Sequence, residues 1–344
     1  MADLSIAGDF DFIQAKVHGL RSRVYEHERL DDLCDLTSVA QLSHRLYPDA
    51  DLADHHALQR RLLADHVATL EGVHRHVPEK LLPLSSWMLR RYQVENLKVL
   101  LRAWKAKEPL ARASAFLAPL AGEMALPAQA FLAAQSLADF LLLVPVPELR
   151  SAGERAAVHQ VATGETFFVE LAFDAAYYRG LAARQQELPE PHRSGTEALL
   201  RLEVAGHNVL SLFRLKLSYH VPYERAAEFL VKLAPHPFRL ERIYDYPDFS
   251  DMLRLVPLEL LPKGGLEGIR GIADLERAVW ARLLQVANRQ FYRSTGDLGA
   301  VVAFFTIKRV ELANVIRVIE GVRYGMERDE IKAGLIRLPQ PVTA

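Results

Sequence analysis

Apolar residues recur with helical spacing along most of this chain, and runs of alternating β-branched residues, which would indicate strands, are scarce. Alanine, leucine, arginine and glutamate, which favour helix, are abundant. Three proline pairs and one glycine-containing stretch interrupt this pattern. We expect loops or helix ends there, because proline is excluded from helix interiors. The interruptions lie at residues 144–147, 189–191, 235–237 and 262–271. The sequence therefore predicts an all-α protein.

One helical pattern occurs three times, each time around an asparagine, in residues 92–102, 204–214 and 310–320. Asn96, Asn208 and Asn314 lie 112 and then 106 positions apart. Positions −4, +1, +4 and +5 from each asparagine are apolar or aromatic in all three copies, and they form one stripe on a helix. The asparagine lies at the edge of the stripe. The pattern indicates a threefold internal repeat.

The spacing predicts three related helical domains of similar size, which we place at residues 1–115, 116–235 and 236–344. A buried carboxamide must be hydrogen-bonded. We therefore expect each asparagine to bond a neighbouring helix and fix the packing of its domain. Direct contact of the asparagines with a partner protein is the alternative.

Length and charge narrow the possible functions. A chain of 344 residues favours two or three compact units. The formal charge of −1 argues against nucleic-acid binding, and the single cysteine, Cys34, excludes a disulfide framework or a multi-cysteine zinc site. The acidic first residues give no expectation of a signal peptide. The longest apolar stretch, 298–307, is too short to cross a membrane.

The candidate chemical motifs are weak. Phosphate-binding glycine loops and the nucleophile elbow of hydrolases do not occur in the sequence, so neither catalysis nor a bound cofactor is expected. Histidines cluster in the first third, which leaves a histidine-dependent metal hydrolase as a minor hypothesis. Their spacing does not match a metal-binding helix, and we favour solvated or partly packed side chains. These residues are His44, His55, His56, His66, His74 and His76.

Positive charge gathers in residues 75–107, which carry eight Lys or Arg against two Glu. Lys98 and Arg102 are one helical turn apart and are expected on one exposed face. Arg214 occupies the position of Arg102 in the second repeat. These three cations are candidates for docking an acidic partner segment. A simply solvated helix face is the alternative interpretation.

The motifs resemble a known family, the C subunit of archaeal and bacterial A/V-type rotary ATPases, which is related to subunit d of eukaryotic vacuolar ATPases. The resemblance extends over nearly the whole chain. It rests on Phe10–Arg21, on Glu95-Asn96-Leu97-Lys98 with Arg102, on Phe173-Asp174 with Tyr177-Tyr178, and on Lys308–Arg317 with Gly321. The family carries an acid three residues before the asparagine. Here that position is Gln93, Ala205 and Glu311, so only Glu311 keeps it.

The resemblance implies a three-lobed, funnel-shaped helical body that sits on the membrane proteolipid ring and receives the central shaft. It implies a non-catalytic rotor subunit with no cofactor, peripheral to the cytoplasmic face of the membrane. Its partners would be shaft subunits of the D and F type and the proteolipid ring, during H⁺ or Na⁺ transport. The motif positions, with Glu311, would be largely architectural. The alternative function is a helical scaffold or adaptor unrelated to ion transport.

Overall fold

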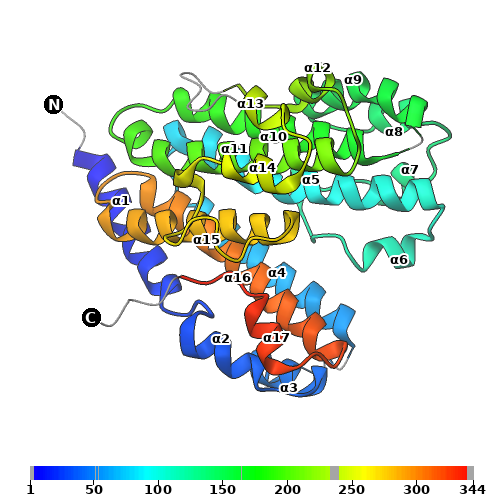
Figure 1. Cartoon of the computed structure of the whole chain (residues 1–344). Helices are drawn as coiled ribbons and strands as arrows, with labels where there is room; N and C mark the ends of the chain where they lie inside the picture. The colour runs from blue at the N-terminus through cyan, green and yellow to red at the C-terminus, as the bar shows by residue number, and fades with distance from the viewer. Residues whose placement is uncertain (1–3, 51, 53, 164, 233–239, 339–344) are drawn as a thin grey trace.

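The computed structural model describes residues 4–338 apart from 51, 53, 164 and 233–239 (Figure 1). These residues form α-helices and short 3-10 turns without any strand, so the all-α prediction is confirmed. No helix in the described ranges is long and apolar enough to cross a lipid bilayer. Breaks occur where prolines predicted them, between α8 (Leu137–Leu142) and α9 (Pro147–Thr163) and between α10 (Phe167–Gln186) and α11 (His192–Leu217). The break expected at 235–237 lies outside the described residues.

Six long helices form the body of the protein as three consecutive pairs, and the second helix of each pair carries one repeat asparagine. The pairs are α4 (His55–His74) with α5 (Leu82–Ala106), α10 (Phe167–Gln186) with α11 (His192–Leu217), and α15 (Ile272–Arg293) with α16 (Gly299–Arg323).

The three pairs close into a ring. Within each pair the two helices are in contact, and the second helix of each pair also packs against the first helix of the next: α5 on α10, α11 on α15, and α16 back on α4 (Figure 1). In addition, α11 contacts α16 across the ring. The first and last thirds of the chain are therefore neighbours, as any closed arrangement of three repeats requires.

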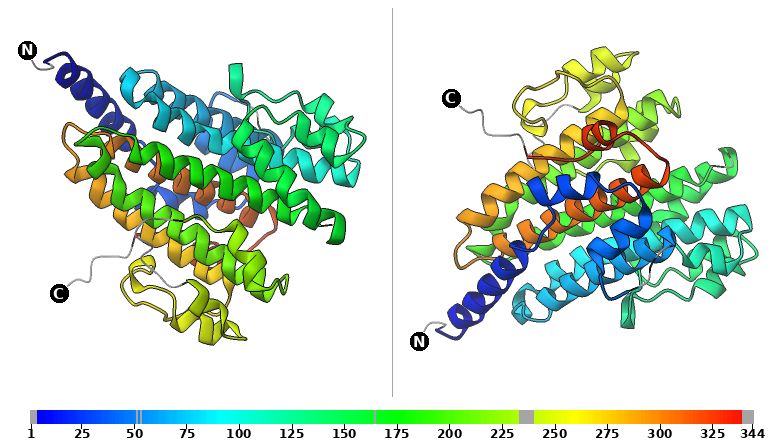
Figure 2. Two further views of the ribbon diagram at one scale, coloured as in Figure 1. Left: turned by 90° about the horizontal axis from the view of Figure 1, so that it is seen from above. Right: turned by 90° about the horizontal axis from the view of Figure 1, so that it is seen from below.

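Shorter elements cover the outside of the ring. α1 packs against α16 and α4, α7 against α5, and α9 against α10, while α2 and α3 pack against α16. Figure 2 shows the N-terminal helices beside the C-terminal segment. The shorter helices are α1 (Leu4–Arg21), α2 (His27–Cys34), α3 (Val39–Leu46), α6 (Leu110–Ser114), α7 (Ala128–Leu132), α8 (Leu137–Leu142), α9 (Pro147–Thr163), α12 (Tyr223–Ala226), α13 (Leu240–Tyr244), α14 (Phe249–Arg254) and α17 (Arg328–Ala333). The 3-10 turns are η1 (Glu79–Leu81), η2 (Gly122–Met124), η3 (Ala227–Phe229) and η4 (Leu258–Leu260).

Each repeat asparagine is buried and bonds the main chain of one residue further along the sequence. Its Nδ2 donates to that residue's carbonyl oxygen, and its Oδ1 accepts from the same residue's N–H, at 2.7–2.9 Å. The three pairs are Asn96 with Ala118, Asn208 with Val231, and Asn314 with Ile336.

These bonds explain why the position needs a carboxamide. Ala118, Val231 and Ile336 are buried and lie in non-helical chain, so neither a helix nor a sheet partners their N–H and C=O groups. One carboxamide supplies the acceptor and the donor that a single residue needs. The expectation that the asparagines bond neighbouring helices is wrong in this respect. The partner is an extended segment that the chain lays back on the same helix 22 or 23 residues later.

The expected domain boundary at 115/116 does not coincide with a gap in the packing. One hydrophobic core cluster extends from Phe10 to Ile336. The bonds between Asn96 and Ala118 cross the expected boundary at 115/116. The boundary at 235/236 lies outside the described residues. The division into domains 1–115, 116–235 and 236–344 stays a prediction.

The asparagine bonds make a testable contribution to stability. Asn208→Ala would leave the buried N–H and C=O of Val231 without partners, and each unsatisfied group costs about 1–3 kcal/mol. We expect the free energy of unfolding in urea to fall by about 2–4 kcal/mol. Gln129→Ala, which removes an exposed carboxamide from α7, is the matched control. Equal losses in the two variants would show that the bonds contribute nothing specific.

Candidate functional site

Polar side chains join consecutive helix pairs at the same place in each repeat. The residue six positions after each asparagine bonds a residue near the start of the next pair's first helix. Arg102 on α5 donates twice to Glu170 on α10 at 3.0 Å, and Arg214 on α11 donates to Glu276 on α15 at 2.7 Å. At the third joint, Gln59 on α4 donates to Glu320 on α16.

Two of the three predicted docking cations, Arg102 and Arg214, are therefore engaged at these joints. The side chain of Arg102 is 60% exposed and that of Arg214 is 40% exposed, so both keep a solvent-facing side. The hydrogen bond with Glu170 raises the pKa of the Arg102 guanidinium above its ordinary value. A contact with a partner would have to share these cations with their intramolecular acids. Their docking role stays a prediction.

Lys98 is buried, and its expected place on an exposed face is wrong. Its Nζ lies 3.1 Å from Oδ1 of Asp174 on α10 and 3.0 Å from Oε2 of Glu95. Arg91 also contacts Asp174, at 3.2 Å. Burial alone would raise the pKa of Asp174, but Arg91 and Lys98 together lower it below its ordinary value. The helical pattern of α5 gives no sign that α10 covers this face.

The position five residues before each asparagine carries a charged side chain in all three repeats. It is occupied by Arg91, Glu203 and Arg309. Glu203 on α11 accepts from Arg309 on α16 at 2.7 Å, in the place where these two helices cross the ring. Their side chains are only 2% and 14% exposed. The Arg309 guanidinium also lies 5.2 Å from the centre of the Trp280 ring.

A buried ion pair of this kind constrains how the helices meet. Removing one partner would leave an uncompensated charge in the core, which is far more costly than the net gain from the pair. Burial lowers the pKa of Arg309, but Glu203 more than reverses this effect, so the guanidinium stays charged. The pair therefore favours one arrangement of α11 against α16.

A small cavity adjoins these groups. It measures about 80 Å³ and is lined in part by Asp174, His207, Arg214 and Trp280. Pockets for nucleotides or other drug-sized ligands are several times larger, whereas this volume suits a few water molecules. Its charged side chains are held in ion pairs, and leucine, valine and tryptophan side chains complete the lining.

Most histidines of the first third contact neighbouring side chains, whereas His44 is exposed. His66 is buried and hydrogen-bonds the Tyr92 hydroxyl, while Nδ1 of His74 lies 2.9 Å from Oγ of Ser85. The rings of His55 and His56 lie 3.8 Å apart. No group of three histidine, cysteine, aspartate or glutamate side chains is placed to hold a metal ion in the part of the chain that is described.

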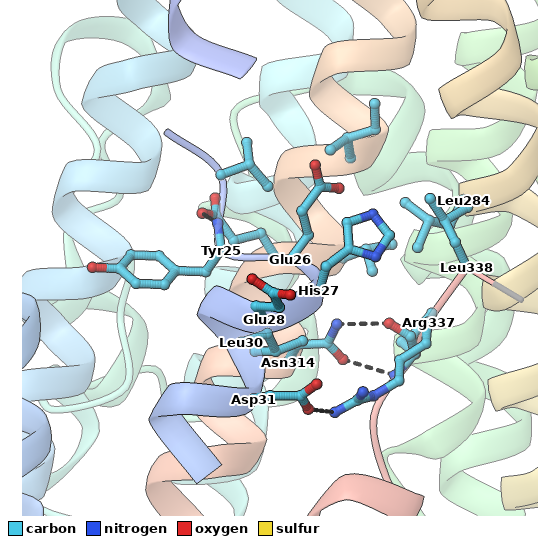
Figure 3. Close-up of a pocket in the computed structure, with 15 residues that line it drawn as sticks. Tyr25, Glu26, His27, Glu28, Leu30, Asp31, Leu284, Asn314, Arg337 and Leu338 are labelled. Atoms are coloured by element: carbon cyan, nitrogen blue, oxygen red, sulfur yellow. Dashed lines mark hydrogen bonds and ion pairs between the residues drawn. The ribbon is translucent and has the colours of Figure 1, made fainter. Parts of the chain in front are cut away.

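A pocket of about 180 Å³ surrounds Asn314, between α16, the start of α2 and the C-terminal segment (Figure 3). Glu311, the surviving motif acid, accepts from the main-chain N–H of Tyr25 at 2.7 Å and also pairs with Lys308. Figure 3 also shows Asp31 bonded to Arg337, at 2.5 Å. Glu311 therefore ties the N-terminal segment to the third repeat.

The other two residues at this motif position behave differently. Gln93 in the first repeat donates to the carbonyl oxygens of Glu123 and Met124 at 3.3 and 3.1 Å. Ala205 in the second repeat has no polar group, and it lines an open groove instead. The residue at this motif position therefore bonds another segment in the first and third repeats, whereas the methyl side chain of Ala205 in the second repeat makes no such bond.

The residues on the first helices that pair at the three joints were not singled out from the sequence. A signal for them exists: Glu170 and Glu276 each lie 38 residues before the asparagine of their own repeat, and Gln59 lies 37 before Asn96. Aligning the first helices of the pairs by this offset would have identified all three positions.

The joint between α5 and α10 can be tested by a double-mutant cycle of Arg102→Ala and Glu170→Ala. We expect a coupling energy of about 1 kcal/mol from urea unfolding, because Glu170 is mostly buried while solvent screens Arg102. The control cycle uses Arg254 and Asp251, an exposed pair within α14, and should give less than about 0.5 kcal/mol. Similar values in both cycles would contradict a structural role for the joint.

Stability should depend on pH through His66, which is buried, and His207, which is partly buried. Burial lowers the pKa of His66 and of His207 to about 3, from an ordinary value of 6.5. Between these values the unfolded chain binds more protons, so stability falls as the pH falls. From pH 7 to pH 5 we expect each histidine to cost about 2 kcal/mol of unfolding free energy.

The measurement is urea unfolding at both pH values for His66→Gln, His207→Gln and the exposed control His44→Gln. His66→Gln and His207→Gln should each remove part of the pH dependence, and the control variant should remove little. A pH dependence that is the same in all three variants would contradict the assignment.

Comparison with known proteins identifies the family. No curated protein matches the chain. The family model described as ATP synthase (C/AC39) subunit matches residues 13–334, which include all six ring helices and the three asparagines. This confirms the resemblance drawn from the repeat motifs. The chain belongs to the ATP synthase (C/AC39) subunit family, whose members are accessory, non-catalytic subunits of V/A-type ATPases.

Proposed function

We propose that this chain is the rotor subunit that couples the central shaft of a V/A-type ATPase to its proteolipid ring. The observation that carries the proposal is the closure of the three helix pairs into a ring. Repeated helix pairs that contact only their neighbours form an open array whose ends are free. Here α16 returns to α4, so each pair is supported on both sides.

Closure suits an element that transmits torque. A twisting load would shear one helix pair past the next, and each joint opposes this with a packed interface and a polar pair on its outer side. Interiors packed at protein density deform little and transmit strain. At the third joint, α1, α2 and α3 add further contacts to α16. These features support a stiff coupling body.

The partners follow from this role. They are shaft subunits of the D and F type on one side and the proteolipid ring on the other, with the chain at the cytoplasmic face of the membrane and peripheral to it. The transported ion is H⁺ or Na⁺, and the ring selects it. The funnel shape belongs to the same proposal, with the end of the shaft received in the funnel.

Co-purification from gently solubilised native membranes tests the partners. A tagged chain should recover the shaft and proteolipid subunits, together with ATPase activity in the eluate. Recovery from the cytosol without these subunits, in cells that contain an intact rotary ATPase, would contradict the proposal.

The coupling role is tested in membranes depleted of the chain. We expect ATP-driven ion uptake to be lost, because shaft and ring are no longer joined, and to return on adding purified chain. Gln129→Ala, with its exposed substitution, should restore uptake as well as the wild type does. Uptake at the normal ratio of ions to ATP in depleted membranes would show that coupling does not need this chain.

A further inference from the structure

An open basic groove lies between α11 and α15. It has a volume of about 650 Å³. Small and apolar side chains line its floor, among them Ala198, Leu202, Ala205 and Val286. Four arginines lie along it: Arg201, Arg282, Arg289 and Arg293. Glu259 is the one acidic residue among the lining residues, which leaves the groove strongly positive.

Two of these arginines are available for a partner. Arg289 and Arg293 are exposed and lie one turn apart on α15. In the described parts of the chain, neither makes a hydrogen bond or an ion pair. By contrast, Arg282 donates to the main-chain oxygen of Glu259 at 2.9 Å, and Arg201 pairs with Glu197. Exposed, uncompensated cations beside an apolar floor are the pattern of a docking surface.

The residue at one motif position distinguishes this groove from the corresponding places in the other two repeats. At the corresponding place in the first repeat, Gln93 bonds η2 and Arg90 pairs with Glu123. In the third repeat, Glu311 bonds the N-terminal segment, and α1 packs against α16. In the second repeat, the position holds Ala205. η4 packs against both α11 and α15, and the main-chain oxygen of its Glu259 accepts from Arg282.

We propose that this groove binds an acidic amphipathic helix of a partner protein. Arg282 to Arg293 cover about 16 Å of α15 at 1.5 Å per residue, which corresponds to about three turns of a bound helix. Small floor residues such as Ala198 and Ala205 let a helix approach closely, so its apolar face would contact the floor. Carboxylates on its flank would pair with Arg289 and Arg293. The proposal does not depend on the rotor role.

The apolar floor favours a helix over other anions. A nucleic acid or a lipid headgroup would present phosphates, which gain nothing from Leu202 or Val286. An amphipathic helix satisfies both the floor and the cations, which is the usual way in which such helices bind grooves.

The test uses the full chain and a synthetic fluorescent helix of Glu-Ala-Leu-Glu-Glu-Leu-Ala heptads, with binding followed by fluorescence anisotropy. We expect saturable, salt-sensitive binding. Arg289→Glu with Arg293→Glu should weaken binding by at least about tenfold, because like charges then face the helix. Arg289→Ala with Arg293→Ala should give a smaller loss in the same direction. Circular dichroism checks that the variants are folded.

Arg60→Glu with Lys105→Glu is the matched control, because it reverses two exposed cations away from the groove and should leave the affinity unchanged. Equal binding by the groove variants would overturn the proposal. So would equal binding of a heptad peptide with its leucines replaced by serine, or of vesicles of anionic phospholipid competing for the same arginines. Equal binding of the serine peptide would exclude the apolar floor as a binding element. Competition by the vesicles would identify a lipid surface as the partner.

Discussion

The hydrogen bonds of the repeat asparagines are the interaction on which the rest of the structure depends. After each long helix ends, the chain returns along it as an extended segment. The buried N–H and C=O groups of that segment have no hydrogen-bond partners in a helix or a sheet. The carboxamides of Asn96, Asn208 and Asn314 supply that partner three times, at nearly the same sequence distance. Each repeat can then bury a full apolar stripe and present its outer side to the next helix pair.

The joints between repeats show how one pattern allows three different surfaces. Arginine and glutamate pair at two joints, whereas glutamine and glutamate pair at the third. The segments laid over the motif position differ as well, and the second repeat leaves its groove open beside Ala205. A symmetrical body thereby acquires faces that are chemically distinct, which an element placed between two different partners requires.

Sequence reasoning reached the helices and the repeat because both depend on local periodicity, and it reached the family through the resemblance of its motifs. It placed the asparagines at the edge of the stripe but not their partners, since a helical pattern does not tell which segment returns to a helix. Lys98 was misplaced for the same reason: α10 covers it, and the acid that it pairs with is 76 residues away. The polar partners Glu170 and Glu276 were missed, although their constant offset from the asparagines was present in the sequence.

Ring closure and family membership support the proposed rotor role, and rotation is the property that tests it most directly. The ATPase complex would be immobilised through its catalytic head, with a bead attached to Lys105→Cys, an exposed position on α5, in a Cys34→Ser background. The account predicts that the bead turns in one direction when ATP is added. A bead that stays still while the same complexes hydrolyse ATP would contradict it.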